Sequence, residues 1–420
     1  MKPDFDVAVV GAGPVGSEAA RKLAEAGRSV VLLEEHETVG APVQCGGLVH
    51  PRLFDLIDFD PAPVKQHEVR GARVFSPNGT RFDLDSGRTH AIAMDRGGFD
   101  RALARRAVKA GAELRTGHQF KAARRASGHV ELDVFVQGGE RAKLTAKLVI
   151  GADGVGSETA RQFRIGSWEN AARSEVLAGY EVELSGMDIA DTDKVDVYTG
   201  SRISPGFFGW LIPTSRTRGR LGLCVAGQGE KVRDGARSRW RSAREYYERL
   251  CQLPFVAEML PDPKAELEIV GSIPVKLADR VVADNAMLVG DAAGCAKPTS
   301  GGGIFMGCTS AHVAARVANE ALAKGDLSAR RLGRYKAELD RGVGRELRKA
   351  WWLRRAFLGM SDADLDRLAH TFQDAKVRAT VNRHGDIDFP SRLVWPLLRR
   401  RPALVRYVAP ALRGMLFGGA

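Results

Sequence analysis

Three glycines near the N-terminus have the spacing of a dinucleotide-binding turn. Gly11, Gly13 and Gly16 directly follow the apolar run 5–10 and open a helical pattern, and Glu34 closes the next apolar run. In such a turn Gly11 makes the sharp bend, Gly13 lets the backbone approach a diphosphate, and Gly16 lets the helix pack on the strand. The helix N-terminus attracts the anion. We therefore predict a dinucleotide site in which Glu34 accepts hydrogen bonds from the adenosine ribose.

Two further segments favour FAD over NAD as the dinucleotide. Asp153 and Gly154 follow the run 148–151 and resemble the second dinucleotide-fold motif of glutathione-reductase-type flavoproteins, in which an Asp-Gly turn packs beside the diphosphate. Gly290 and Asp291 resemble the downstream Gly-Asp motif of that superfamily, whose aspartate holds the flavin ribityl chain. A dehydrogenase that uses only NAD has no need of this second carboxylate. The resemblance implies FAD as the cofactor.

Arg96 and Asp100 resemble the RxxFD element of the same flavoproteins, in which the arginine meets the diphosphate. The alternative is a surface arginine and a helix cap.

Three successive glycines stand before the apolar helical run of the last third of the chain; with the first residue of the run they are Gly301, Gly302, Gly303 and Ile304. Residues without side chains let a flat ring lie against the backbone, and a helix N-terminus stabilises negative charge on a reduced isoalloxazine. We interpret this segment as part of the flavin site, with a flexible linker as the alternative.

An apolar, aromatic run in the middle of the chain suits a pocket for an apolar substrate. By its composition alone, a strand of the hydrophobic core is the simpler interpretation. It resembles the PxxYxWxFP motif of the geranylgeranyl reductase family, with Phe208 at the tyrosine position and Ile212 at the phenylalanine position. The candidate substrate-binding residues are therefore Pro205, Phe208, Trp210 and Pro213.

Two other segments are similar to archaeal-type members of this family, the digeranylgeranylglycerophospholipid reductases among them. Residues 40–49 contain Cys45 and Gly46, where these enzymes carry a cysteine beside the flavin, and residues 385–391 resemble a C-terminal motif of the subgroup. The resemblance implies an enzyme that saturates the isoprenoid chains of membrane lipids or their precursors.

The expected mechanism follows from the alkene, which has no carbonyl to polarise it and must gain a hydride at one carbon and a proton at the other. We expect hydride transfer from reduced flavin, with aromatic side chains such as Trp210 and Phe208 beside the developing cation. Cys45 is a candidate to donate or steer the proton, and a small packing residue is the alternative. Phe208 lacks a hydroxyl, so no proton-donor role of the family's tyrosine carries over to it.

A flavin-dependent monooxygenase or halogenase is the second hypothesis, because it shares the FAD motifs. Halogenases pair a WxWxIP motif with a lysine; here Phe208 replaces the first tryptophan and Lys65 lies in an unconvincing loop. This class requires oxygen for product formation, whereas a reductase does not.

Composition is that of a globular protein with a large core: 420 residues, 44% hydrophobic and 27% charged. The first strand begins so close to Met1 that we expect no signal peptide and a cytoplasmic protein. Five cysteines without metal-type spacing predict reduced thiols and no metal site.

The formal net charge of +12 favours an anionic partner. Residues 391–420 contain six arginines and no acidic residue among many apolar side chains. The tail suits the surface of an anionic membrane, and equally a helical domain with solvated arginines. No RNP, KH or zinc-knuckle pattern occurs, so we expect no nucleic acid partner.

The elements that position these residues predict an α/β (α+β) fold: an FAD-binding Rossmann-like domain, a β-sheet substrate domain and a helical C-terminal region. We place the FAD-binding domain at 1–70, 91–165 and 271–325, the β-rich domain at 71–90 and 166–270, and the helical region at 326–420. Within them we expect strands between 178 and 225, a helix around 240–250, and a helix break at 325–326.

The sequence leaves the electron donor open between NADPH and a ferredoxin-like carrier, since no nicotinamide site is recognisable. It also leaves open the prenyl chain, the headgroup, the number of double bonds reduced and the oligomeric state.

Overall fold

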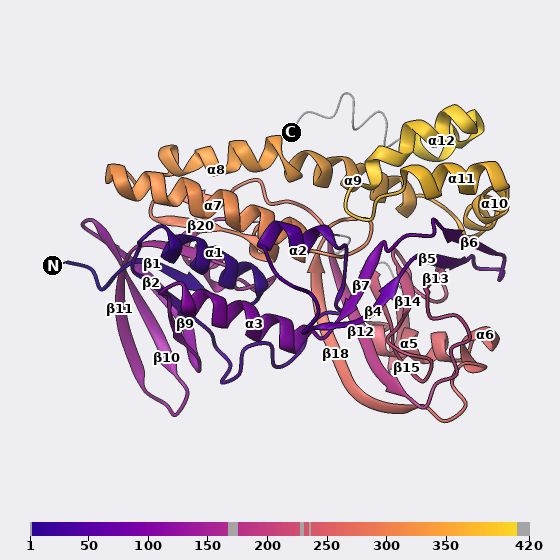
Figure 1. Cartoon of the computed structure of the whole chain (residues 1–420), viewed down its shortest axis with the longest axis horizontal. Helices are drawn as coiled ribbons and strands as arrows, with labels where there is room; N and C mark the ends of the chain where they lie inside the picture. The colour runs from indigo at the N-terminus through magenta and orange to yellow at the C-terminus, as the bar shows by residue number, and fades with distance from the viewer. Residues whose placement is uncertain (1, 167–174, 227–230, 235–236, 410–420) are drawn as a thin grey trace.

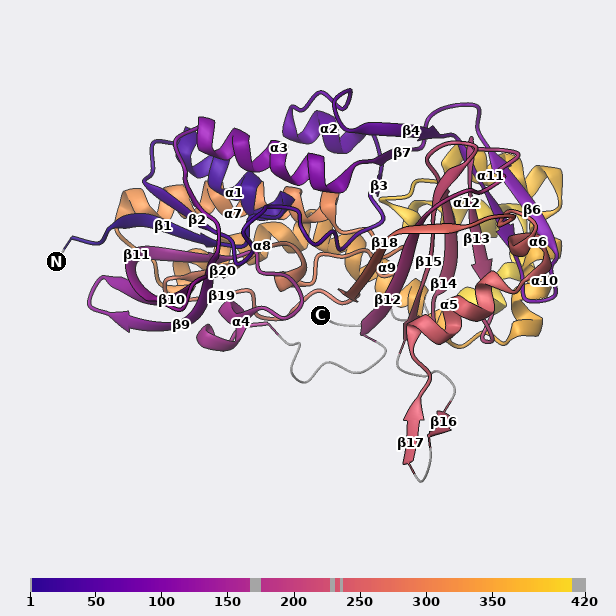
Figure 2. The same ribbon diagram turned by 90° about the horizontal axis from the view of Figure 1, so that it is seen from below.

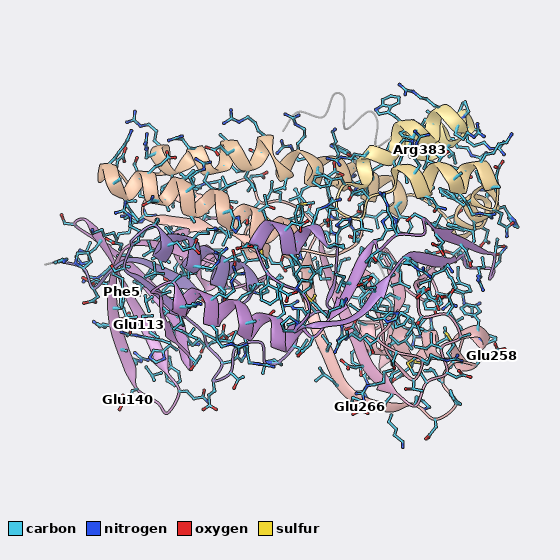
Figure 3. The ribbon with its side chains drawn as sticks, viewed as in Figure 1. Phe5, Glu113, Glu140, Glu258, Glu266 and Arg383 are labelled. Atoms are coloured by element: carbon cyan, nitrogen blue, oxygen red, sulfur yellow. The ribbon has the colours of Figure 1, made fainter. Side chains whose placement is uncertain are left out.

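The computed structural model describes residues 2–166, 175–226, 231–234 and 237–409. The chain forms two sheet-containing lobes joined along the long axis of the molecule, with C-terminal helices lying across both (Figure 1). In Figure 3, Glu113 and Glu140 lie at the outer end of one lobe, Glu258 lies at the outer end of the other, and Glu266 lies at the lower edge of that second lobe. The predicted mixed α/β fold class is confirmed.

The first lobe is built on an eight-stranded sheet with the order β19-β20-β11-β1-β2-β8, extended by β10 and β9. Strands β20, β11, β1, β2 and β8 are parallel to their neighbours, whereas β19, β10 and β9 pair in antiparallel fashion. The bounds are β1 Phe5–Val10, β2 Val30–Leu33, β8 Glu113–Arg115, β9 His118–Ala126, β10 His129–Val136, β11 Arg141–Gly151, β19 Val282–Ala283 and β20 Ala286–Leu288.

Helix α1 (Pro14–Glu25) packs against α3 (Arg96–Lys109) and α7 (Ile304–Lys324) on one face of this sheet. Figure 2 shows the three helices on the same side of β1 and β2, with the β9-β10 hairpin on the other. The short α4 (Glu158–Phe163) contacts β9 and β11. The apolar strands β1, β2 and β11 are buried between these layers, as expected for a covered parallel sheet.

The second lobe is a seven-stranded sheet with the order β18-β12-β15-β14-β13-β5-β6. Helix α5 (Ala243–Cys251) packs on β12 and β15 and is followed by α6 (Pro254–Ala257). The strand bounds are β5 Gly71–Phe75, β6 Arg81–Asp85, β12 Val176–Ser185, β13 Lys194–Thr199, β14 Phe208–Pro213, β15 Arg218–Ala226 and β18 Lys264–Pro274.

Smaller elements join the lobes and extend the second one. A three-stranded sheet, β3-β7-β4, stands between the lobes next to α2, and a two-stranded hairpin, β16-β17, projects from the second lobe. Their bounds are β3 Leu48–Val49, α2 Arg52–Ile57, β4 Lys65–Val69, β7 Ala91–Met94, β16 Lys231–Asp234 and β17 Arg237–Trp240.

Within the described part of the chain, the residues from Ile304 onward form helices and no strand, as the sequence predicts. Helix α7 ends at Lys324 because Gly325 adopts a left-handed conformation, which confirms the expected break. The helix expected around 240–250 begins only at Ala243, where Ser242 forms a capping box with Glu245. The remaining bounds are η2 Gly290–Ala293, α8 Ala329–Arg341, α9 Val343–Leu358, α10 Asp362–Phe372, α11 Ala375–His384, η3 Pro390–Leu393, α12 Val394–Arg400 and η4 Pro402–Leu404.

Candidate active site

A cavity of about 640 Å³ lies where the two lobes meet. Its walls come from the loops that follow β1, β11 and β20, from the segment around Cys45, from the inner face of the second sheet, and from the segment 381–387. Because β1, β11 and β20 are neighbouring parallel strands, their carboxyl ends bring the three predicted cofactor motifs to one edge of the sheet.

The first glycine motif makes the tight contacts expected of it. Gly11 has a φ of +97°, and a Cβ there would lie 2.5 Å from the carbonyl oxygen of Ala152. A Cβ at Gly16 would lie 1.9 Å from the carbonyl oxygen of Gly11, so only glycine lets α1 pack this closely on the turn. At Gly13 no described atom lies within 4 Å of an added Cβ, and this open space is part of the cavity.

Glu34 lies at the end of β2, outside the residues that line the cavity. One carboxylate oxygen accepts from the backbone N–H of Ala12 at 2.9 Å and the other from that of His36 at 3.1 Å. Glu34 therefore braces the glycine turn and stands at its outer side, where the adenosine end of a dinucleotide would extend.

Asp153 and Gly154 have different parts in the second motif. The half-buried Asp153 carboxylate accepts from the Ser157 hydroxyl at 2.6 Å and from the backbone N–H of Thr159 at 2.9 Å, so it organises the start of α4. Gly154 lines the cavity, and no described atom stands within 4 Å of a Cβ built on it.

The third motif brings Asp291 into the cavity wall, together with Gly290, Gly301, Gly302, Gly303 and Ile304. A Cβ at Gly303 would lie 2.8 Å from Asp291 Oδ1, which shows how closely this backbone approaches the carboxylate. Burial raises the pKa of Asp291 to about 6, although the charge of Arg96 opposes the rise.

Arg96 and Cys45 lie together at the centre of the cavity wall. Arg96 forms a buried ion pair with Asp100 at 2.8 Å, and its guanidinium also contacts the Cys45 thiol. Burial alone would lower the pKa of Arg96, but Asp100 and Cys45 reverse this and raise it. Cys45 Sγ also accepts from the backbone N–H of Gly47 at 3.5 Å, so both of these contacts donate to the sulfur.

The loop with Cys45 is held from the second sheet by Arg220. Its guanidinium donates to the carbonyl oxygens of Gly46 at 2.8 Å and Met94 at 3.1 Å, and it pairs with Glu183 at 3.2 Å. This buried arginine therefore fixes the distance between the Cys45 loop and the second sheet.

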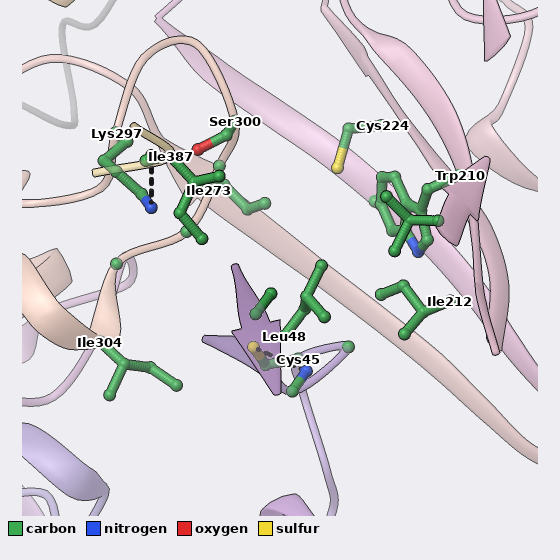
Figure 4. A pocket seen from close by; sticks show the side chains of 18 of the residues that line it. Cys45, Leu48, Trp210, Ile212, Cys224, Ile273, Lys297, Ser300, Ile304 and Ile387 are labelled. Atoms are coloured by element: carbon green, nitrogen blue, oxygen red, sulfur yellow. Dashed lines mark hydrogen bonds between the residues drawn. The ribbon is translucent and has the colours of Figure 1, made fainter. Parts of the chain in front are cut away.

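The aromatic motif divides into lining and structural residues. Phe208 and Trp210 line the cavity, and Trp210 and Ile212 face the loop with Cys45 and Leu48 across it (Figure 4). The Phe208 ring stacks on Phe207 with centroids 4.3 Å apart. The prolines are not among the lining residues: Pro205 accepts from the backbone N–H of Ala226 at 2.9 Å, and Pro213 ends β14.

The C-terminal motif forms part of the cavity wall. Lys297 Nζ donates to the carbonyl oxygen of Ile387 at 3.0 Å, drawn as the dashed line in Figure 4, and to Asp388 at 2.7 Å. Arg52 pairs with Asp386 at 2.9 Å. These contacts attach the segment 385–388 to both the flavin-side loop and α2.

Sequence reasoning missed Glu181, which lies in the same wall. It stands at the centre of β12 and is buried, and Trp210 Nε1 donates to its Oε2 at 2.6 Å. Nothing in the local sequence marks this residue, because its neighbours come from three other parts of the chain.

Comparison with known proteins places the chain in a family. A model described as FAD binding domain matches residues 4–348. The digeranylgeranylglycerophospholipid reductase of Methanosarcina acetivorans is 32% identical over 388 residues, which cover 90% of each chain. The protein of the same name from Methanocella arvoryzae is 30% identical over 415 residues, 97% of this chain and 98% of the relative. The chain belongs to the digeranylgeranylglycerophospholipid reductase family.

Solved structures agree with this assignment to the reductase family. A geranylgeranyl bacteriochlorophyll reductase-like protein of Thermoplasma acidophilum has a TM-score of 0.84 at 25% identity, covering 97% of this chain and 99% of that one. A flavin-dependent brominase triple mutant has a TM-score of 0.69 at 16% identity, with coverage of 96% and 99%. The brominase likeness concerns the fold alone.

The cavity residues of this family member fit FAD, the cofactor that the domain match implies. Helix α1 begins at Pro14, its N-cap residue Gly13 has no side chain to cap it, and the space beside Gly13 and Gly154 is open in the described part of the chain. Asp291 presents a carboxylate next to the glycine backbone of 301–303. Uncapped backbone N–H groups suit a diphosphate, and a buried carboxylate suits hydroxyl groups.

The described residues contain neither a metal-binding cluster nor a helix that could span a membrane. They contain no group of three or more His, Cys, Asp or Glu side chains arranged to hold a metal ion. No helix in the described ranges has the length and hydropathy needed to cross a bilayer.

Proposed function

We propose that this protein is an FAD-dependent reductase that adds two hydrogens across carbon–carbon double bonds in the geranylgeranyl chains of membrane glycerophospholipids or their precursors. Its family membership supports the reaction class, and the two relatives named above carry that substrate in their names. The cavity supports it on chemical grounds.

One observation carries the proposal: the cofactor cradle and an apolar wall share a single cavity. Opposite the three cofactor motifs, the second sheet contributes Val195, Val197, Phe208, Trp210, Ile212, Ile269 and Ile273. Such a wall binds a hydrocarbon chain by removing it from water, and it offers few polar groups to a polar substrate.

Reduced FAD bound at the cradle supplies the hydride that an isolated alkene requires. The protein's own part is to hold the chain, exclude water and stabilise charge. The indole of Trp210 faces the cavity and stabilises positive charge on the substituted alkene carbon. Phe208 stacks on Phe207 and provides a flat apolar surface against which the chain can lie.

We further propose that the protein contacts the surface of an anionic membrane, where its substrate resides. Of the basic tail, residues 410–420 lie outside the described part of the chain. Within the described part, Trp395 is 56% exposed and stands near the exposed Arg399 and Arg400. Exposed tryptophan beside arginines is typical of interfacial contact. For the electron donor that reduces the flavin, we propose either NADPH or a ferredoxin-like carrier.

Anaerobic turnover tests the function. The FAD-loaded protein is reduced with dithionite, mixed with geranylgeranyl diphosphate or digeranylgeranylglycerophospholipid, and sampled for substrate mass. We expect a gain of two hydrogens for each flavin reoxidised. Flavin that stays reduced until oxygen is admitted, with an oxygenated or halogenated product, would instead identify a monooxygenase or halogenase.

A further inference from the structure

Glu181 is one of the residues that form the wall of the cavity. It is 3% exposed and lies in the middle of β12. The strand registers pair Glu181 with Gly222 on β15, and Gly222 with Trp210 on β14. The three residues therefore form a row across three adjacent strands, on the face of the sheet that turns toward the cofactor motifs.

The row is arranged around a missing side chain. A Cβ at Gly222 would lie 2.7 Å from Glu181 Cβ and 2.9 Å from Trp210 Cζ2. Because glycine leaves this space, the Trp210 indole reaches across β15 and donates to Glu181 Oε2 at 2.6 Å. From the other lobe, the backbone of Gly46 approaches so closely that a Cβ there would meet the same oxygen at 2.5 Å.

The second carboxyl oxygen of Glu181 is the unusual feature. Oε1 is buried and has no hydrogen-bond partner in the described part of the chain. A buried carboxylate oxygen without a donor is costly, whereas a protonated carboxyl group tolerates such a place better. Since Oε2 accepts from the indole, the proton belongs on Oε1.

The surroundings favour this proton. Burial raises the pKa of Glu181 to about 7, although the Trp210 hydrogen bond and the charge of Arg220 oppose the rise. The other titratable groups around it are Glu183 on its own strand, which adds to the rise, and the thiols of Cys224 on β15 and Cys45 in the opposite loop. From β18, the paired residue is the apolar Ile269.

We propose that Glu181 is the general acid of the reduction and that it donates the Oε1 proton to the substrate alkene. The inference rests on the proposed reductase function and adds a catalytic residue to it. Cys45 is the less suitable donor, because Arg96 and the Gly47 N–H both donate to its sulfur.

The hydride and the proton reach different carbons of the double bond. One alkene carbon accepts a hydride, which carries two electrons from the reduced flavin, and the other carbon accepts the Glu181 proton. The carbon–carbon π bond breaks and two C–H bonds form. Glu181 is left as a carboxylate and regains one proton from water before the next double bond is reduced.

Single-turnover kinetics of Glu181→Gln test the proposal. The amide keeps the shape of the side chain and an oxygen to accept from Trp210, but it has no acidic proton. We expect FAD to bind and to be reduced by dithionite as in wild type, while anaerobic reoxidation by the isoprenoid substrate slows by about 100-fold to 10,000-fold, the range for loss of a general acid. Glu268→Gln is the matched control, because Glu268 is exposed on the same sheet and pairs with Val182, the next residue along β12.

The pH profile gives a second readout that a purely structural role does not move. The acid must be protonated, so wild-type reoxidation should be fast below pH about 7 and fall above it. The residual rate of Glu181→Gln should lose this descending limb. Even if the variant failed to fold, a wild-type rate constant that stayed level from pH 6 to 9 would overturn the proposal.

The outcomes separate this inference from the function on which it rests. If wild-type flavin is not reoxidised by either isoprenoid substrate, the proposed function fails. If wild type is active and Glu181→Gln reoxidises within a few-fold of it, the function stands and Glu181 is not the acid.

Discussion

At the scale of a single residue, Asp291 shows that a group suited to bind a cofactor can lower the stability of the protein without that cofactor. Its folded pKa of about 6 lies above the ordinary value of 3.8, so the apoprotein loses stability as the pH rises from 3.8 to about 6, and the loss is complete above about 6. At pH 8 the full penalty, about 3 kcal/mol for a shift of this size, is present. Below pH about 4 it is absent.

Replacing Asp291 with Asn removes this charge and keeps the shape. We expect the Asp291→Asn apoprotein to be more stable than wild type at pH 8, by up to about 3 kcal/mol, and the difference to shrink at pH 5. Urea unfolding at the two pH values measures it. FAD affinity should fall, because an amide is a weaker acceptor than a carboxylate. If wild type and Asp291→Asn were equally stable at pH 8, the ionised Asp291 would not destabilise the apoprotein and this account would be wrong.

Cys45 offers a contrast with Glu181 at the same scale. In Cys45→Ser the hydroxyl oxygen can accept from Arg96 and from the Gly47 N–H, as the sulfur does. We therefore expect FAD to be retained and anaerobic reoxidation by substrate to slow by less than about 10-fold. Stopped-flow absorbance of the flavin checks this. A loss as large as that expected for Glu181→Gln would make Cys45 the proton donor in its place.

At the scale of elements, the site depends on how closely α1 approaches the end of β1. The Cβ of Gly16→Ala would lie 1.9 Å from the carbonyl oxygen of Gly11, so the helix must move away from the sheet. We expect this variant to lose several kcal/mol of stability and to be purified without FAD.

Gly13→Ala is the matched variant, because no described atom lies within 4 Å of its Cβ. We expect it to fold as wild type does and to bind FAD more weakly, since the methyl group enters the space beside the helix N-terminus. Thermal unfolding and flavin content measured on both variants separate the two effects. A stable, FAD-saturated Gly16→Ala protein would contradict this account of the turn.

These elements also show what the sequence could predict. The glycine turns, the Gly325 helix end and the strand pattern are local, so their residues reveal them without a structure. The row of Glu181, Gly222 and Trp210 is not local: it exists only because three strands pair in one register. The same limit explains Pro205 and Pro213, which belong to a motif read as substrate-binding although neither lines the cavity.

At the scale of the whole molecule, the first lobe, the second lobe and the layer of C-terminal helices have separate tasks. The first lobe gathers three cofactor motifs at one edge, the second lobe contributes an apolar wall, and the C-terminal segment 385–388 adds to the wall and is held by Lys297 and Arg52. A substrate that is a membrane lipid, as proposed above, must pass from a bilayer into this cavity. We propose that the exposed Trp395 and its neighbouring arginines, in the C-terminal layer, orient the molecule on the membrane.

Charge reversal tests that orientation. In Arg399→Glu/Arg400→Glu, two exposed cations become anions, and basic residues near an anionic surface each contribute about 1 kcal/mol to binding. We expect sedimentation with phosphatidylglycerol vesicles to weaken by at least about 10-fold, and wild-type binding to weaken with salt. The control Arg124→Glu/Arg125→Glu makes the same change in net charge on the β9 hairpin, at the opposite end of the molecule (Figure 1). Equal losses in both variants would mean that overall charge, and not the C-terminal layer, brings the protein to lipid.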